Sequence, residues 1–215
     1  MKKIISFSLW GDNPKYLQGA IENLRLQKML YSSWTCRFYC HDKVNIGIIN
    51  ELQSNGAEIV IKTENPFNRP MDAPGMFWRF EVLKDLDVDR FIVRDTDGRL
   101  TQREVNCVKD WEKSQKDFHI IRDHAQHSTK IMGGIWGATN TFIKRINYDD
   151  LLNSFNKLQY NNIYATDQEF LARIIYPLIK DTACIHDDWD RYKEGARKIP
   201  HLKINDEYIG QPIEI

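Results

Sequence analysis

The segment Asp89-Arg90-Phe91-Ile92-Val93-Arg94-Asp95-Thr96-Asp97-Gly98 carries a short apolar run between charged residues. The run Phe91-Ile92-Val93 favours a strand that is buried on both faces of a parallel sheet. Two carboxylates, Asp95 and Asp97, follow at once, and Gly98 then allows the chain to turn. Ligands of open α/β sheets bind beyond the carboxyl ends of the strands, where two acids are placed to hold a divalent cation against phosphate.

The Asp-x-Asp pattern by itself is common in this chain. It occurs at four places, which are Asp85/Asp87, Asp87/Asp89, Asp95/Asp97 and Asp188/Asp190. Only Asp95 and Asp97 directly follow the pattern of a buried strand. Residues two apart in an extended segment point to the same side, so we expect these two carboxylates to face one ion. The alternative interpretation is a solvated acidic turn.

Length and composition narrow the class of protein. The 215 residues suffice for one large domain with a real core. Equal numbers of basic and acidic residues give zero net charge, which argues against a nucleic-acid or membrane-surface binder. The four cysteines lack zinc-type spacing, and we expect reduced thiols. A strand begins within the first few residues and no membrane span follows, so the sequence predicts a cytoplasmic protein.

The first third of the chain alternates between strand and helix patterns. Strands are expected at 4–10, 37–40 and 58–61, with a helix from Asn13-Pro14 to Leu30 and another over 44–52. Such alternation predicts an α/β fold with a mostly parallel central sheet flanked by helices. The proline-containing segment 65–75 is expected to be a surface loop.

The rest of the chain continues these patterns with one glycine-rich interruption. Helices are expected over 76–86, 104–111, 148–158 and 166–176, and strands over 118–121 and 182–185. Thr166 is expected to cap the last helix, with Asp167 in its first turn. Residues 131–138 lack a dinucleotide fingerprint and a P-loop, and indicate either a sharply bent strand or a place where a ligand approaches the backbone.

Six features, taken in order, resemble those of one enzyme class. They are the strand 4–10, Phe77-Trp78-Arg79-Phe80, Arg94-Asp95-Thr96-Asp97, Gly133-Gly134, Asp167-Gln168-Glu169 and His186. Their order over residues 4–190 resembles that of GT-A nucleotide-sugar-dependent glycosyltransferases. The sequence is also similar to the transferase domains with which large algal (chlorella) viruses glycosylate their capsid protein. This resemblance implies a single GT-A-like domain over 1–215, with a nucleotide-binding half over about 1–100 and an acceptor side over about 101–215.

The resemblance also implies roles for individual residues. Asp95, Asp97 and His186 would bind Mn²⁺ or Mg²⁺, and Arg79 would contact the donor phosphate or sugar. Asp167 would be the acid beside the reacting sugar. The remaining implied donor contacts are Ser8, Trp10, Gly11, Thr96, Gly133 and Gly134. The implied reaction moves a hexose-type sugar from a UDP-sugar to a glycan or glycoprotein, in the host cytoplasm if the protein is viral and without a nucleic-acid partner.

Three alternatives remain open at this point. A nucleotidyltransferase acting on sugar phosphates also uses strand-end carboxylates, but it usually has a basic, glycine-rich loop after the first strand. Here the only cation of that segment is Lys15. A non-catalytic nucleotide-sugar-binding module would need the aromatic residues without the acids and His186. Within the enzyme interpretation, a neighbouring acid (Asp187, Asp188 or Asp190) is an alternative to His186 as the late metal ligand.

Overall fold

The structure is a computed structural model that describes residues 1–63, 73–158, 165–200, 203 and 205–213. The described residues form a seven-stranded sheet in the order β3-β2-β1-β4-β6-β5-β7. The strands are β1 (Lys3–Leu9), β2 (Thr35–His41), β3 (Glu58–Lys62), β4 (Arg90–Arg94), β5 (Phe118–Arg122), β6 (Ile135–Thr139) and β7 (Cys184–Asp187).

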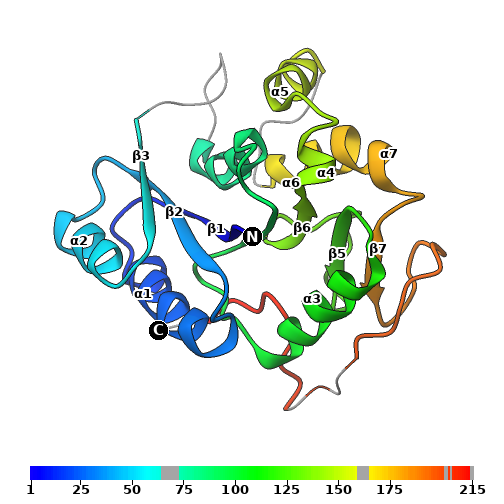
Figure 1. The fold of residues 1–215 in the computed structure, drawn as a ribbon, viewed down its shortest axis with the longest axis horizontal. Coiled ribbons are helices and arrows are strands. Elements are labelled where there is room, and N and C mark those ends of the chain that lie inside the picture. Colours follow the sequence, from blue (N-terminus) through cyan, green and yellow to red (C-terminus); the bar gives the residue numbers. More distant parts are fainter. Residues whose placement is uncertain (64–72, 159–164, 201–202, 204, 214–215) are drawn as a thin grey trace.

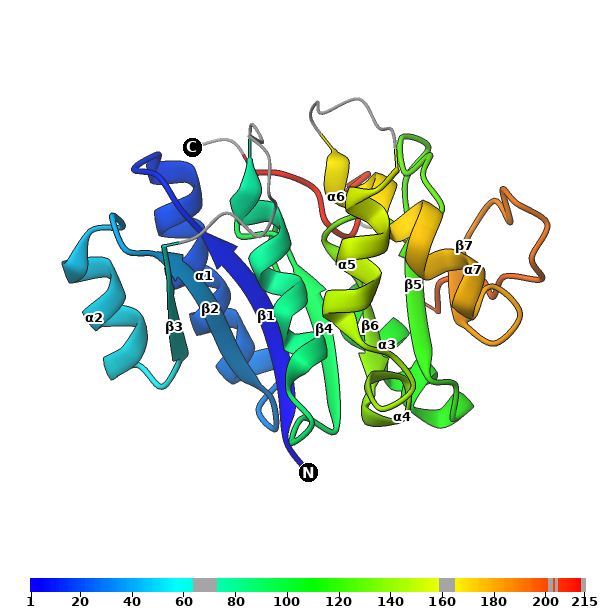
Figure 2. The ribbon, with the colours of Figure 1, turned by 90° about the horizontal axis from the view of Figure 1, so that it is seen from above.

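The sheet is mostly parallel, as the strand-helix alternation predicts. β1 pairs in parallel with β2 and β4, β2 pairs in parallel with β3, and β5 pairs in parallel with β7. Only β6 runs the other way, antiparallel to both of its neighbours, β4 and β5. The carboxyl ends of the six other strands therefore meet at one edge of the sheet (Figure 2).

Helices cover both faces of the sheet, so the fold has three layers (Figure 1). One face carries α1 (Pro14–Leu30), α2 (Ile46–Ser54) and α3 (Gln102–Ser114). The other carries the 3-10 helix η1 (Pro74–Lys84), α4 (Asn140–Ile143), α5 (Tyr148–Asn156), α6 (Thr166–Phe170), the π-helical turn η2 (Leu171–Ile175) and α7 (Tyr176–Ile179).

The N-termini of two helices show where local sequence predicts a helix cap correctly and where it does not. At α1 the side chain of Asn13 accepts a hydrogen bond from Lys15 N (3.0 Å) and Pro14 is the first helical residue, which confirms the prediction. At α6 the expected cap is wrong. Thr166 is already inside the helix, because the chain enters from Ala165 in the left-handed conformation (φ 74°). The expected helix at 76–86 is η1, wound as a 3-10 helix.

The core has one apolar layer on each side of the sheet. Along β1, Ile5, Phe7 and Leu9 pack toward α1 and α2, whereas Ile4 packs toward η1. Ser6 and Ser8 share the face of Ile4 and are also buried. The four cysteines are free, as expected of reduced thiols.

The two loop segments before η1 and α6 lie mostly outside the described residues. The predicted surface loop at 65–75 is described only from residue 73, and the segment before α6 only from residue 165. Among the described helices, none combines the length and apolar character that crossing a membrane requires.

Gly137 provides a test of the central strand pairing. It lies in β6 opposite Ile92 of β4, and an added Cβ would lie 2.5 Å from the backbone oxygen of Phe91. Backbone of a central strand cannot move aside, so we expect Gly137→Ala to lower the free energy of unfolding by about 2–3 kcal/mol. Urea denaturation measures this. Gly47→Ala in α2, where the new methyl meets only the Asn45 side chain at 3.0 Å, is the matched control and should be near neutral.

Candidate active site

A cleft of about 540 Å³ opens at the carboxyl ends of β1 and β4. These two strands are neighbours, and β2 follows β1 on the far side, so the strand order reverses here. Such reversal points are where open α/β sheets bind ligands. The cleft is lined by Trp10, Tyr16, Ala73, Met76, Arg79, Asp95, Asp97, Gln126, His127, Met132, Gly133, Gly134, Ile135, Ala165, Asp167, Gln168, Tyr208, Gly210 and Pro212.

The two carboxylates of the acidic turn both line this cleft. The side chain of Asp95 is 40% exposed and that of Asp97 is 18% exposed. Asp97 Oδ2 lies 3.3 Å from the ammonium of Lys15, in the first turn of α1. Within the described residues, the ion pairs leave Oδ2 of Asp95 and Oδ1 of Asp97 unused. Two oxygens from neighbouring carboxylates are therefore available to a common ligand.

Arg79 of η1 connects the acidic turn to α6. Its Nη1 donates a hydrogen bond to Asp95 Oδ1 (2.5 Å) and its Nη2 donates to Asp167 Oδ2 (2.8 Å). Arg79 and Asp167 are both nearly fully buried. Asp167 Oδ1 is buried as well and has no hydrogen-bond partner among the described residues. The three predicted residues are thus brought together from η1, the end of β4 and the start of α6.

The backbone of Arg79 is fixed by two serines of β1. Ser6 Oγ donates to the carbonyl oxygen of Arg79 (2.7 Å), and the amide of Arg79 donates to Ser8 Oγ (2.9 Å). Both serines are buried, and their spacing of two places them on one face of the strand. Ser8, which the resemblance assigns to the donor, therefore holds Arg79 in place. It also lines a small pocket that shares Asp95 and Asp97 with the cleft.

Burial sets the protonation behaviour of the two acids beside Arg79. Enclosure raises the pKa of Asp95, and the neighbouring Asp97 adds to this while Arg79 opposes it. Burial likewise raises the pKa of Asp167, again with Arg79 lowering it and Asp95 raising it. A buried carboxylate has less water to stabilise its charge, so the guanidinium is what favours the ionised forms.

The glycine pair Gly133-Gly134 makes room for these carboxylates. A Cβ on Gly134 would overlap Asp95 Oδ2, and a Cβ on Gly133 would overlap Asp167 Oδ2. The arrangement combines both interpretations of residues 131–138, because β6 begins at Ile135 and the glycines before it line the cleft. Any side chain here would displace an acid.

Of the other predicted donor contacts, Trp10 lines the cleft, whereas Thr96 and Gly11 do not. Trp10 makes an edge-to-face contact with Trp78, with ring centroids 6.3 Å apart. Thr96 is buried beside Asp95 and Asp97. Gly11 occupies the left-handed conformation (φ 75°) just after Trp10, which turns the chain away from β1 toward α1.

The structure does not bring His186 to the cleft. His186 lies within β7, where its ring nitrogens face His119 Nε2 (2.9 Å) and Asp110 Oδ2 (3.1 Å). The physical reason is strand alternation, which points His186 into the layer between the sheet and α3. The alternative acids are also engaged elsewhere, since Asp187 pairs with Arg122 and Asp188 pairs with Arg103. Asp190 Oδ1 accepts hydrogen bonds from the amides of Glu194 and Ala196.

Sequence reasoning missed several residues of the cleft. His127 follows β5, and its Nδ1 accepts a hydrogen bond from the amide of Asp123 (2.9 Å), which leaves the proton on Nε2. Burial lowers its pKa to about 4, so it stays neutral at physiological pH. A polar residue after a predicted strand is a usable indication. The sequence carries no such indication for Tyr208, because this residue lies on the C-terminal segment. Its ring contacts that of His127 edge-on.

The residues present fit a divalent cation at the acidic turn. Carboxylate oxygens are the ligands that Mg²⁺ and Mn²⁺ prefer. In the described part of the cleft, Asp95, Asp97 and Asp167 face only two cations, Arg79 and Lys15. One negative charge is left over, which favours the entry of a cation together with an anionic ligand.

Comparison with known proteins identifies the fold. No family model matches the sequence, and no curated protein matches it. The structure is similar to that of the galactosyltransferase LgtC in complex with donor and acceptor sugar analogues, with a TM-score of 0.59, 12% identity, and coverage of 87% of this chain and 74% of that one.

Two further solved structures are similar. A glycosyltransferase involved in glycosylation of the major capsid of PBCV-1 gives a TM-score of 0.51 at 11% identity, covering 88% of this chain and 82% of that one. GlyE of Streptococcus pneumoniae TIGR4 gives 0.54 at 14% identity, covering 89% and 47%. The seven-stranded α/β architecture of this chain is therefore the GT-A fold of glycosyltransferases.

Proposed function

We propose that this protein is a metal-dependent glycosyltransferase. It moves a hexose-type sugar from a nucleotide-diphosphate sugar, a UDP-sugar in our proposal, to a glycan or glycoprotein acceptor. The observation that carries the proposal is the arrangement Asp95–Arg79–Asp167 in a cleft at the reversal point of a GT-A fold. We place the protein in the cytoplasm.

The donor half of the cleft is assigned by charge. Asp95 and Asp97 would hold Mn²⁺ or Mg²⁺, which supplies positive charge to the diphosphate leaving group. Arg79 and Lys15 already lie beside these acids, at 2.5 and 3.3 Å, and are positioned to share the acids with a bound diphosphate. Trp10 and Tyr16, on the wall of the same cleft, offer flat apolar surfaces for the nucleotide base.

The acceptor half is assigned by its neutral hydrogen-bonding groups. His127, Gln168 and Tyr208 line the side of the cleft away from β1. Gln168 Oε1 accepts a hydrogen bond from Thr129 (3.0 Å), which orients the side-chain amide of Gln168. Asp167 is the adjoining acid, and its buried Oδ1, which has no partner among the described residues, would have to turn toward the cleft to meet a reacting sugar hydroxyl. These groups match a polyhydroxylated acceptor.

Donor binding is the direct test of this function. The protein is mixed with Mn²⁺ and, separately, UDP-glucose, UDP-galactose, GDP-mannose and dTDP-glucose, and its melting temperature is measured. A donor at about 100-fold excess over its Kd should stabilise the fold by about 3 kcal/mol, or about 5–10 °C. Absence of a shift and of sugar transfer with every donor would refute the proposal. Pyrophosphate release from UTP and a sugar phosphate would support a nucleotidyltransferase instead.

Asp97→Asn tests the metal assignment. It keeps the shape of the side chain but removes the charge, so the donor-induced shift in Mn²⁺ should disappear, as it should when EDTA is added to the unchanged protein. The fold should remain intact because Asp97 lies outside the core. Asp12→Asn, in the exposed turn after β1, is the matched control. Donor binding that persists in EDTA would count against a bound cation.

Gly134→Ala tests whether the glycine positions Asp95. The added methyl overlaps Asp95 Oδ2, so we expect Mn²⁺ affinity to fall at least 10-fold while the far-UV circular dichroism is unchanged. Gly98→Ala is the matched control, because a methyl at Gly98, directly after Asp97, meets nothing closer than 3.5 Å. Equal effects of the two substitutions on Mn²⁺ affinity would contradict the assignment.

Asp167→Asn separates chemistry from binding. The amide keeps the shape beside Arg79, so donor affinity should change little, whereas turnover should fall by a factor on the order of 10² or more. Asp150→Asn, which removes an exposed acid from the first turn of α5, should leave turnover unchanged. Wild-type turnover in Asp167→Asn would reduce Asp167 to a structural partner of Arg79.

A further inference from the structure

A second group of ligand-type side chains lies between the sheet and α3, away from the cleft. His119 of β5 and Cys184 and His186 of β7 are all buried, with at most 2% of any residue exposed. One potential ligand atom from each lies within 4.8 Å of the others. The indole of Trp111 stacks on the ring of His119, with centroids 5.0 Å apart, so the group is enclosed by α3.

Strand geometry explains why these three residues meet. Cys184 and His186 are two apart on β7 and therefore point to the same face. His119 is the register partner of Cys184 on the adjacent parallel strand β5. Strands spaced by about 4.8 Å place such side chains in contact. The three side chains are thus positioned by two paired strands alone, without a contribution from a loop.

The hydrogen bonds around the group leave one buried atom without a partner. His186 Nε2 lies 3.1 Å from Asp110 Oδ2, so this nitrogen carries the proton and Nδ1 presents a lone pair toward His119. His119 Nδ1 has no hydrogen-bond partner among the described residues. The two imidazole nitrogens that face each other are therefore the candidate ligand atoms, and on metal binding the proton of His119 Nε2 would move to Nδ1.

We propose that His119, Cys184 and His186 form a binding site for zinc or a similar thiolate-preferring divalent ion. Imidazole and thiolate are the donors of protein zinc sites, whereas the carboxylates of the cleft suit harder ions. Asp110 behind His186 matches the carboxylate that commonly orients a ligating histidine. This site is independent of the proposed glycosyltransferase activity.

Coordination requires only small movements. Zinc–nitrogen and zinc–sulfur bonds of about 2.0–2.3 Å place tetrahedral ligand atoms about 3.3–3.8 Å apart. The present separations range from 2.9 Å, between the two imidazoles, to at most 4.8 Å. Shifts of about 1 Å suffice, and the His119–His186 hydrogen bond is exchanged for two bonds to the ion. Cys184 binds as the thiolate, so its proton is released to solvent on binding.

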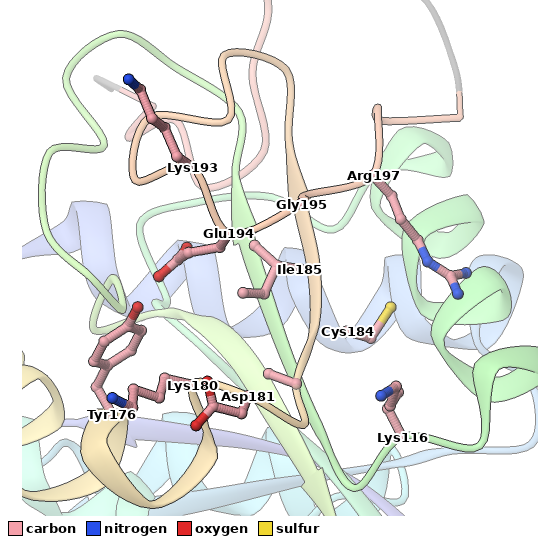
Figure 3. Close-up of a pocket in the computed structure, with 11 residues that line it drawn as sticks. Lys116, Tyr176, Lys180, Asp181, Cys184, Ile185, Lys193, Glu194, Gly195 and Arg197 are labelled. Carbon is pink, nitrogen blue, oxygen red and sulfur yellow. The ribbon is translucent and has the colours of Figure 1, made fainter.

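A cavity of about 570 Å³ at the outer edge of β7 is lined by Cys184, whereas His119 and His186 do not line it. Figure 3 shows the sulfur of Cys184 on the cavity wall, between Lys116 and Arg197 in this view. Arg197 is paired with Asp110 (2.7 Å), which offsets its charge on the route inward. The open side of the cavity leaves room for a water as a fourth ligand.

Bound metal would stabilise the edge of the sheet that β7 forms. β7 is an edge strand of four residues, and the following chain returns to it through the bridge between His186 and Arg197. An ion held by both β5 and β7 would anchor this edge to the sheet interior. We therefore expect metal to stabilise the protein.

Cobalt is the probe that reports a thiolate ligand directly. The purified chain, stripped with chelator, is titrated with Co²⁺ near neutral pH, and absorbance is recorded in the near ultraviolet and the visible. We expect a thiolate-to-cobalt charge-transfer band that saturates at one ion per chain, and Zn²⁺ should remove the band and raise the melting temperature. The cleft carboxylates cannot produce such a band.

Variants assign the band to these residues. Cys184→Ala should abolish it, whereas Cys36→Ala, which removes another buried thiol in β2, should retain it. Asp110→Asn should retain the band with Co²⁺ affinity lower by about 10- to 100-fold. The Mn²⁺-dependent donor shift should be unaffected in Cys184→Ala, which separates this proposal from the proposed function.

Two results would overturn the proposal. The unchanged protein could show no charge-transfer band and no thermal shift with Zn²⁺, in which case Asp110, His186 and His119 form only a hydrogen-bonded chain. Alternatively, the band could persist in Cys184→Ala, in which case another thiol binds the ion. Both measurements on unchanged protein are informative even if Cys184→Ala fails to fold.

Discussion

The guanidinium of Arg79 holds together parts of the chain that are far apart in sequence. It donates to Asp95 at the end of β4 and to Asp167 at the start of α6, while Ser6 and Ser8 of β1 fix its backbone. Placing the buried carboxylate of Asp167 so close to the partly buried carboxylate of Asp95 is costly unless a cation is shared between them. The geometry of the cleft therefore depends on this one side chain, and the glycines opposite it exist because the shared carboxylates leave no room for a Cβ.

The same arrangement explains why a net-neutral chain can carry an acidic cleft. Arg79 and Lys15 balance two of the three negative charges of the cleft carboxylates, and one negative charge remains. Both cations lie on elements that precede the acids in sequence. A metal ion and a diphosphate entering together would add charges of opposite sign and leave the balance nearly unchanged. A cleft balanced in this way favours joint binding of the two over binding of either alone.

Much of the fold was predictable from periodicity, whereas the site was predictable only where a short stretch of sequence determines the local structure. The buried run at Phe91 and the cap at Asn13 are local patterns, and both are confirmed. His186 was misplaced because β7 extends to Asp187, beyond the expected strand end at residue 185, so His186 lies within the strand. Thr166 was misplaced because the chain enters α6 from Ala165 in the left-handed conformation. The reversed direction of β6 left no trace in its apolar sequence. The pairing of Arg79 with Asp167 joins residues 88 apart, and only the resemblance had suggested that both belong to one site.

The C-terminal segment completes the cleft and ties its two halves together. The amide of Ile213 donates to the carbonyl oxygen of Asp97, and the amide of Ile209 donates to Asp123 after β5. Figure 2 shows this segment crossing the carboxyl edge of the sheet. It contributes Tyr208, Gly210 and Pro212 to the lining. These contacts join residues about 85 to 115 apart, so their formation closes long loops of the chain at an entropic cost. The acidic turn and the segment that follows β5 are consequently held relative to each other by the last part of the chain, which carries no recognisable motif of its own.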